Sequence, residues 1–381
     1  MFESSLSRRS ALRTLAAIGA TAFGATACAD TTATPATPLS SGPPPSAQPQ
    51  AAAARMIGAE WDEHVRTLMS WPASNSIWKG DLAGARDDIA ALAKAIAAHE
   101  PVVLMARPEH ADDAQRACGN DVEVVPIPVD DLWARDTVPV FVGGSAAVDF
   151  NFNGWGTKQN PHDKDAAVAK TVLEKYEITR IETPLVAEGG SFETDGAGTL
   201  MATESSLVND NRNPGKTRQQ IEDELKRILG VRKVIWFAGV RGEDITDAHV
   251  DCLARFAAPG VVLLDKTAPG APADVWSRAA AQAKTVLADA TDANGKRIEV
   301  VDLPQPEDAR GYDENSVISY CNFYVANKSV FMPRFGDAAA DDRARGILAE
   351  HFPGREIVPV QIQTIASGGG GIHCSTHDQP R

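Results

Sequence analysis

The feature that most constrains this chain is a helix-then-strand pattern that recurs along most of its length. Stretches with an apolar residue every three or four positions indicate amphipathic helices, and a short apolar run typical of a buried strand follows each of them. The predicted helices span residues 83–99, 163–176, 216–229, 272–288 and 339–351. The strands that follow span residues 102–106, 178–183, 233–237, 298–303 and 356–362.

Further strands are predicted between three of these strands and the next helix. They span residues 138–142 with 147–152, 249–257 with 261–265, and 316–325 with 330–332. The repeating unit is therefore strand, strand, helix, strand. We predict an α/β fold in which five such units form the blades of one closed, pseudo-symmetric propeller. The spacing of the units is irregular and no shared motif marks them, so a three-layer α/β sandwich is the alternative.

The first 54 residues are predicted to lie outside this fold. Arg8 and Arg9 precede a small and apolar run from Leu12 to Ala27, which has the shape of a twin-arginine export signal. That run is too short for a permanent anchor, because spanning a bilayer takes about 20 apolar residues. We therefore expect a signal peptide over residues 1–29, a disordered Pro/Ala/Thr-rich linker over 30–54 and a single folded domain over 55–381.

Cys28 directly follows a small-residue cleavage site at residues 25–27 and resembles the modified cysteine of a lipoprotein. Ala25 departs from that pattern, because such sites prefer Leu three residues before the cysteine. The sequence thus predicts export to the periplasm or the extracellular space. It leaves open whether a lipid on Cys28 holds the protein at a membrane.

Charge and cysteine usage exclude several classes of function. Lys and Arg number 37 against 51 Asp and Glu, a formal net charge of −14, and no long basic run interrupts this background. Nucleic acid is therefore excluded as an expected partner, since phosphate binding needs concentrated positive charge. The acidity serves either solubility or attraction of a cationic substrate. The five cysteines form no C-x-x-C pair, so no disulfide framework or zinc ribbon is encoded, and homo-oligomer formation stays open.

Two segments in the first half combine carboxylates with groups suited to a cation. Residues 129–137 place three carboxylates beside Trp133 and Arg135, an arrangement that can bind a delocalised cation by paired hydrogen bonds and stacking. A solvated loop with a local salt bridge is the alternative. Glu188 precedes two glycines, where the backbone can approach a ligand or simply turn sharply.

Two segments in the second half carry acid/base and nucleophilic residues. If residues 249–257 form a strand, His249 and Asp251 share one face as an acid/base pair, or else form an exposed polar face. Four consecutive glycines, residues 368–371, lead to Cys374 and allow close approach to a reacting centre, although a flexible tail is also glycine-rich. A zinc site from His249, Asp251, His373 and Cys374 is conceivable by residue type, but its spacing matches no standard zinc motif.

Taken together, these segments resemble the agmatine deiminase and bacterial peptidylarginine deiminase family, in the pentein superfamily of guanidino-modifying five-bladed α/β propellers. The matching segments run over essentially the whole domain: Glu60-Trp61, Trp71-Pro72, residues 131–136, residues 153–156, residues 188–191, residues 209–214, residues 249–251, residues 335–337 and residues 368–374.

The resemblance implies a role for each candidate residue. Cys374 would be the nucleophile, His249 the acid/base, Asp136 and Asp251 the carboxylates that grip the guanidinium, and Glu188 a further acidic residue that supports His249 and the substrate. Trp133, Asp131, Ile245 and Gly370 would contribute to substrate binding. The chemistry implied is hydrolytic deimination of a small cationic guanidino compound or an arginine peptide, through a covalent thiouronium on Cys374. No metal or organic cofactor is implied.

Departures from the agmatine deiminase pattern concern the tail of the substrate. Ile245 stands where those enzymes have an acidic residue, Ala248 and Val138 stand where glycine is usual, and Gly371 replaces an asparagine. Agmatine, which would give N-carbamoylputrescine and ammonia in a step of putrescine biosynthesis, is favoured narrowly over peptidyl or free arginine, which would give citrulline. A non-catalytic surface-tethered binder of cationic ligands and an amidinotransferase are the other readings.

Overall fold

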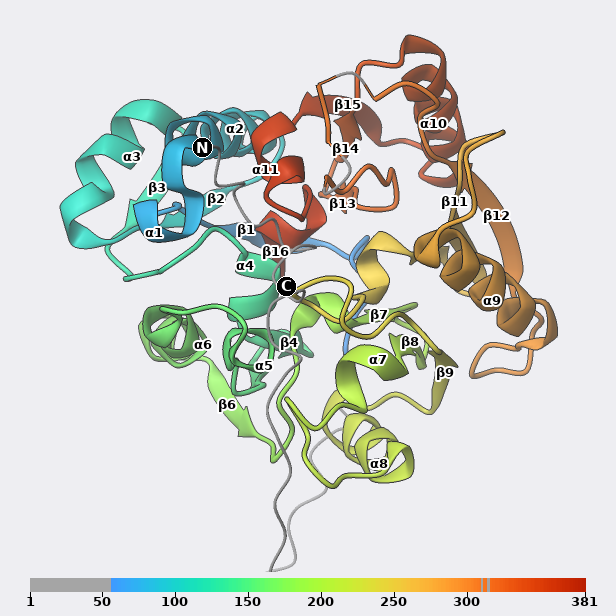
Figure 1. Ribbon diagram of the computed structural model, residues 1–381. Helices are drawn as coiled ribbons and strands as arrows, with labels where there is room; N and C mark the ends of the chain where they lie inside the picture. The colour runs from blue at the N-terminus through green and yellow to red at the C-terminus, as the bar shows by residue number, and fades with distance from the viewer. Residues whose placement is uncertain (1–55, 310, 314–315) are drawn as a thin grey trace, which may run out of the picture.

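The computed structural model of the chain describes residues 56–309, 311–313 and 316–381. Within them, five small sheets surround a common centre and the longer helices lie outside the sheets (Figure 1). The predicted five-bladed α/β propeller is therefore confirmed. The predicted signal peptide, Cys28 and the linker lie outside the described residues.

Four blades share one topology, in which an antiparallel strand pair is followed by a helix and a third strand parallel to the second. The second blade contains β4(Val140–Val142), β5(Ala146–Asp149), α6(Asp163–Lys175) and β6(Thr179–Glu182); the third contains β7(Phe192–Thr194), β8(Thr199–Thr203), α8(Arg218–Leu229) and β9(Lys233–Phe237). The fourth contains β10(Ala254–Ala258), β11(Val261–Lys266), α9(Val275–Asp289) and β12(Glu299–Pro304); the fifth contains β13(Tyr324–Val325), β14(Ser329–Arg334), α10(Ala338–His351) and β15(Glu356–Gln361).

The first blade joins the two ends of the described chain. It contains β1(His64–Ser70), α2(Leu82–Ala97), β2(Val102–Met105), α3(Ala111–Cys118) and β3(Val122–Val125), together with β16(Thr376–Pro380) from the C-terminus. Strand β16 pairs antiparallel with β1, with Thr376 opposite Met69, and so supplies the first strand of this blade. The ring closes by strand pairing, which leaves Cys374 two residues before that strand.

Helix α8 shows how the sequence specifies one blade. Thr217 and Gln220 form a reciprocal capping box at its N-terminus, and Gly230 ends it at φ 71°, a left-handed conformation that costs glycine little. The buried face consists of Ile221, Leu225, Ile228 and Leu229. This face packs in a cluster with side chains from the second and third blades, so the helix is held mainly by burial of apolar surface.

Two of the predicted inner strands are wrong. Residues 250–252 form a 3₁₀ turn, η4(Val250–Cys252), and the strand begins only at Ala254; of residues 316–325, only Tyr324 and Val325 are in a strand. Both segments are largely buried near the centre, so their apolar side chains resemble a strand although the backbone turns. Helix α3 and strand β3 were not predicted either.

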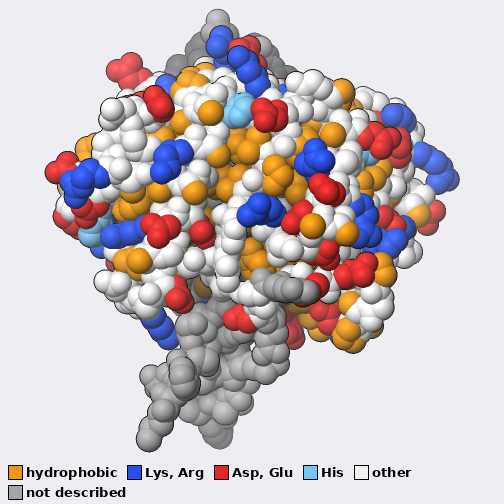
Figure 2. Space-filling model, turned by 90° about the horizontal axis from the view of Figure 1, so that it is seen from above, with side chains coloured by type: hydrophobic (Ala, Val, Ile, Leu, Met, Phe, Trp, Pro, Cys, Tyr) orange, Lys and Arg blue, Asp and Glu red, His pale blue; other side chains and the backbone are white. Residues whose placement is uncertain are grey.

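Short helical elements complete the described chain. They are α1(Asn75–Trp78), η1(Lys79–Asp81), η2(Pro108–His110), α4(Ala134–Thr137), α5(Gly154–Thr157), η3(Gly189–Ser191), α7(Glu204–Leu207), α11(Gln363–Ser367) and η5(His373–Ser375). No helix in the described ranges has both the length and the apolar character that a membrane crossing would require. Figure 2 shows basic and acidic side chains interspersed over one face of the molecule.

Candidate active site

The blades enter their first strands through turns near the centre, and functional side chains come from these turns. Asp136 lies in α4 before β4, Glu188 directly before η3 and β7, Asp251 in η4 before β10, Asn322 two residues before β13, and Cys374 in η5 before β16. Corresponding positions in five different blades therefore supply the candidate site. This repetition explains how residues 238 positions apart, Asp136 and Cys374, come to serve one centre.

Cys374 is held by contacts on both sides of its thiol. Its side chain is 3% exposed, and its Sγ lies 3.4 Å from Oδ2 of Asp251. Asn322 donates from Nδ2 to this Sγ at 3.3 Å and accepts from the Cys374 backbone N–H at 3.3 Å. The thiol is thus oriented by a carboxylate and an amide, as a positioned nucleophile requires.

Asp251 presents a free carboxylate oxygen inside the protein. The side chain is fully buried, and its Oδ2 also contacts Nδ1 of His373 at 2.9 Å, while its Oδ1 has no hydrogen-bond partner among the described residues. Burial alone would raise the pKa of Asp251, but His373, His249 and Arg255 lower it well below its usual value. Asp251 is therefore an ionised carboxylate with an unused acceptor, which suits a cationic donor.

His249 lies between two carboxylates and next to Gly190. Its Nδ1 is 3.7 Å from Oδ1 of Asp136, and its Nε2 is 3.1 Å from Oε2 of Glu188. A Cβ on Gly190 would lie 2.7 Å from His249 Nδ1, 2.9 Å from Asp136 Oδ1 and 3.1 Å from Asp251 Oδ2. Only glycine fits there, and the three groups thus converge on one small volume.

The protonation of His249 follows from these neighbours. Burial alone would lower the pKa of His249, but Asp136, Glu188 and Asp251 raise it overall. Glu188 stays ionised, because Arg212 and His249 lower its pKa in spite of burial. Since a carboxylate can only accept, Nε2 carries a hydrogen, and Nδ1 is the nitrogen free to exchange a proton on the side of Asp136.

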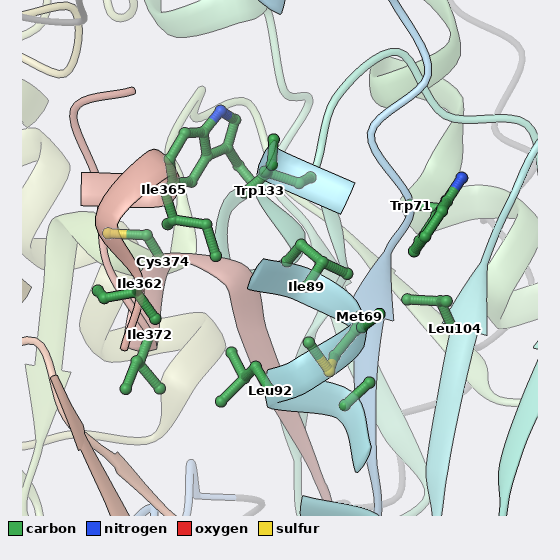
Figure 3. Close-up of a cluster of buried hydrophobic side chains, with 14 of the residues drawn as sticks. Met69, Trp71, Ile89, Leu92, Leu104, Trp133, Ile362, Ile365, Ile372 and Cys374 are labelled. Atoms are coloured by element: carbon green, nitrogen blue, oxygen red, sulfur yellow. The ribbon is translucent and has the colours of Figure 1, made fainter. Parts of the chain in front are cut away.

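The glycine-rich segment packs against two indole rings. A Cβ on Gly368 would lie 2.3 Å from the Trp78 ring, and one on Gly370 would lie 2.1 Å from the Trp133 ring. Both indoles donate to the Asp131 carboxylate at 2.6 Å, which fixes the rings in place. Figure 3 shows Trp133 and Cys374 in one buried hydrophobic cluster. Asp131, Trp133 and Gly370 therefore support the loop that carries Cys374.

A small cavity of about 60 Å³ reaches this centre. His249, Asp251 and Cys374 line it, and so do Cys252 and Asp244. A larger cavity of about 560 Å³ lies beside α10 and is lined by none of these residues. The size of a cavity therefore does not identify the candidate active site.

Ile245 does not line the small cavity. Its side chain is 7% exposed and belongs to the same buried cluster as Trp133 and Cys374. The turn around it is unusual, because Asp247 and Ala248 have φ values of 59° and 64°, in the left-handed region that favours glycine. Asp244, the residue before Ile245, is the carboxylate that this turn places at the cavity.

Three contributors were not predicted from the sequence. Arg212 donates to both oxygens of Glu188 at 2.8 and 3.0 Å, Asn322 holds Cys374, and Cys252 lies beside it. The position of Asn322 relative to β13, equivalent to that of Cys374 relative to β16, is the signal that could have identified it. The pairing of Arg212 with Glu188 leaves no such trace, since it depends on the tertiary fold.

Comparison with known proteins places this geometry in a family. Residues 56–380 match the family described as Porphyromonas-type peptidyl-arginine deiminase. The agmatine deiminase of Stutzerimonas stutzeri is 39% identical over 350 residues, covering 84% of this chain and 94% of that protein. The agmatine deiminase of Medicago truncatula is 35% identical over 362 residues, covering 84% and 95%. The structure of the agmatine deiminase of Enterococcus faecalis superposes with a TM-score of 0.81 at 29% identity, covering 86% and 96%.

Proposed function

The chain belongs to the Porphyromonas-type peptidyl-arginine deiminase family, and on that basis we propose that it hydrolyses the guanidino group of agmatine to N-carbamoylputrescine and ammonia. Curated relatives at 35 to 39% identity are agmatine deiminases. The observation that carries the proposal is the convergence of the Cys374 thiol, the His249 imidazole and the carboxylates of Asp136 and Asp251. A binder of cations would need the carboxylates but no nucleophile.

Substrate binding is proposed to depend on the two carboxylates. A guanidinium is planar, resonance-stabilised and a poor electrophile, so it must be fixed and its charge held while it is attacked. Asp251 offers its Oδ1, which has no partner within the described part of the chain, and Asp136 Oδ1 approaches the same point beside Gly190. Gripped by both, the guanidinium would present its central carbon to Cys374.

The first chemical step is attack by the Cys374 thiolate on that carbon. The tetrahedral adduct then expels ammonia, which takes a proton from Nδ1 of His249. A thiouronium that carries the substrate tail remains on Cys374. His249, now neutral, removes one proton from water, and the resulting hydroxide attacks the same carbon. Collapse of this adduct displaces the Cys374 thiolate and releases the second water proton to solvent, which leaves the ureido product.

Glu188 and Arg212 are proposed to orient His249. Glu188 fixes its Nε2 hydrogen, and Arg212 in turn fixes Glu188 through a fully buried ion pair. Arg212 also donates to Asp247 at 2.9 Å, which ties it to the turn that precedes His249. Removal of one member of such a buried pair costs about 3 to 5 kcal/mol, so these residues serve both position and stability.

The experiment that tests the proposal is ammonia release from agmatine, free arginine and arginine peptides, measured side by side. We expect turnover of agmatine by the wild type, no turnover by the Cys374→Ala variant, and most of the turnover with the Cys118→Ala or Cys321→Ala variant. Activity should survive EDTA. Turnover by a folded Cys374→Ala variant would contradict the assignment of the nucleophile.

Arginine or an arginine peptide is the second candidate substrate. The specific observation is Ile245, which is buried, apolar and outside the cavity, so it offers no charge to the amine of agmatine. Asp244 and Asp265 also line the cavity, and Asp244 already accepts from Thr246 and Ala248. A higher kcat/KM for arginine peptides than for agmatine would favour this candidate.

We further propose that the protein is exported by the twin-arginine route and acts in the periplasm or outside the cell, held at a membrane through lipidated Cys28. The Arg8-Arg9 pair, the uncharged run after Arg13 and the small residues before Cys28 support this. Mass spectrometry of the mature N-terminus tests it: a diacylated Cys28 supports anchoring, and a terminus without lipid contradicts it.

A further inference from the structure

A second thiol lies next to the proposed nucleophile. The Sγ of Cys252, the Sγ of Cys374 and a carboxylate oxygen of Asp251 all lie within 4.8 Å of one another. Asn322 donates to both sulfurs, at 3.2 Å to Cys252 and 3.3 Å to Cys374. The deimination chemistry proposed above uses one thiol only, so the second is unexplained by it.

The spacing of Cys374 Sγ and Asp251 Oδ2 matches two ligands of a tetrahedral metal site, and the Sγ of Cys252 lies near both residues. Around zinc, with Zn–S near 2.3 Å and Zn–O near 2.0 Å, a sulfur and an oxygen lie about 3.5 Å apart and two sulfurs about 3.8 Å apart. The distance from Cys374 Sγ to Asp251 Oδ2 is 3.4 Å, and the Sγ of Cys252 lies within 4.8 Å of the Cys374 Sγ and of an Asp251 carboxylate oxygen.

A second observation points to a cation. Oδ1 of Asp251 is buried and has no hydrogen-bond partner in residues 56–309, 311–313 and 316–381, so the carboxylate keeps an acceptor that a cation would occupy. Two thiols and a carboxylate form a donor set that selects zinc and similar thiophilic ions over magnesium or calcium. The amide of Asn322 remains available to hydrogen-bond the metal-bound sulfurs as an outer-shell partner.

We propose that Asp251, Cys252 and Cys374 form a binding site for one thiophilic divalent cation, represented by Zn²⁺, and that occupation of this site inhibits the enzyme. The cation takes Asp251 from the guanidinium and the thiolate of Cys374 from the reaction. The inhibitory part of the proposal rests on the proposed function, whereas binding does not. Zn²⁺ and the guanidino substrate therefore compete for the same residues.

Binding is tested by titration of the reduced, full-length protein with Co²⁺ under anaerobic conditions. We expect one equivalent to produce the near-ultraviolet charge-transfer band of cobalt–thiolate coordination, and Zn²⁺ to abolish that band. The Cys252→Ala variant should bind at least about 10-fold more weakly, since loss of even outer-shell partners costs 10- to 100-fold. The Cys118→Ala variant, which removes a buried thiol that does not line the cavity, is the matched control and should bind like the wild type.

Inhibition is tested separately by ammonia release. Zn²⁺ should inhibit the wild type, substrate should relieve the inhibition, EDTA should restore activity, and the Cys252→Ala variant should require at least about 10-fold more Zn²⁺. If the untreated wild type releases no ammonia, the proposed function fails while the cobalt titration still decides the metal site.

A wild type without the charge-transfer band, or a folded Cys252→Ala variant with an undiminished one, would overturn the proposal. If the Cys252→Ala variant does not fold, an alkylation experiment on the wild type tests the metal site instead. Zn²⁺ should then slow alkylation of Cys252 and Cys374 together in peptide mass maps, and alkylation of either thiol at an unchanged rate would overturn the site.

Discussion

His249 gains its acid/base character from single residues on either side of it. Asp136 and Glu188 contact its two ring nitrogens, and both carboxylates are buried. Burial and charge act in opposite directions on the imidazole, and the charges prevail, so the pKa of His249 rises above its ordinary value. The raised pKa widens the pH range in which the imidazole carries the proton that the expulsion of ammonia requires.

The pH profile of kcat/KM should report the raised pKa of His249. Protonated His249 is present below its raised pKa and is lost as pH rises through that value, so the wild type should lose activity on a basic limb. Glu188→Gln removes one of the charges that raise the pKa of His249, and the limb should move to lower pH. An unmoved limb in a folded Glu188→Gln variant would mean that another group controls it. The Glu204→Gln variant, altered at a partly exposed carboxylate, is the control.

Some residues of the candidate site could be recognised from the sequence, and others could not. Asp136, Glu188, Asp251 and Cys374 stand beside glycines, tryptophans or turns that make their segments distinctive. Asn322 lies in Tyr-Cys-Asn-Phe, which has the composition of a buried strand, and Cys252 was assigned to a predicted strand. The proximity of Cys252 to Cys374 leaves no local pattern. The place of Asn322 two residues before β13 could not be recognised, because residues 316–325 were predicted as one strand.

At the scale of elements, the glycine-rich segment before η5 is a packed loop. Trp78 and Trp133 occupy the space that a side chain at Gly368 or Gly370 would need, and Asn322 occupies the space beside Gly371. Gly371 is thus matched to the position of Asn322. The segment holds Cys374 by close contact rather than by mobility.

Gly370→Ala should therefore damage both fold and activity. The added methyl would lie 2.1 Å from the Trp133 ring, and overpacking of this kind costs about 1 to 3 kcal/mol. Gly346→Ala is the matched control, because nothing lies within 4 Å of a Cβ there and alanine stabilises the helix α10 by about 0.5 to 1 kcal/mol. Denaturant unfolding and agmatine turnover measure the effects. Equal free energies of unfolding for the two variants would contradict the packed loop.

The elements themselves were predicted well where their pattern is local. The five main helices and the strands that follow them begin and end within three residues of the predicted positions, because amphipathic spacing and turns specify them. The strands predicted at residues 249–257 and 316–325 were placed wrongly, because turns buried at the centre have the apolar composition of strands. The closing pair of β16 and β1 joins the two ends of the domain, which no local pattern reveals.

At the scale of the whole molecule, Glu60 connects the blades at the centre. It accepts from Arg135 of the second blade, Arg255 of the fourth, the Val325 backbone of the fifth and His373 beside the site, each at 2.8 Å. Burial would raise the pKa of Glu60, but these cations lower it well below its ordinary value. One carboxylate thus neutralises charges from several blades.

Glu60→Gln should destabilise the whole ring. Removal of one partner from a buried ionic network costs about 3 to 5 kcal/mol. The matched control is Glu63→Gln, three residues away, whose carboxylate is 65% exposed and pairs with Arg381 at the surface; such pairs contribute about 0 to 1 kcal/mol.

The pH dependence of this effect follows from the lowered pKa. The stabilisation by Glu60 is present above the pKa of an unfolded glutamate and is lost as pH falls through the lower pKa of the folded state. Denaturant titrations at neutral and acidic pH measure both effects. Similar losses of unfolding free energy for Glu60→Gln and Glu63→Gln would contradict the role of the central network.

The central claim of the account is covalent catalysis by Cys374, and acid quenching of the enzyme during turnover tests it most directly. Wild type mixed with agmatine and quenched within one turnover should yield, by peptide mass spectrometry, an adduct of agmatine minus ammonia on Cys374. The adduct should be absent from the Cys374→Ala variant. An adduct on Cys252 instead, or steady ammonia release with no adduct on any cysteine under conditions that preserve a thiouronium, would contradict the account.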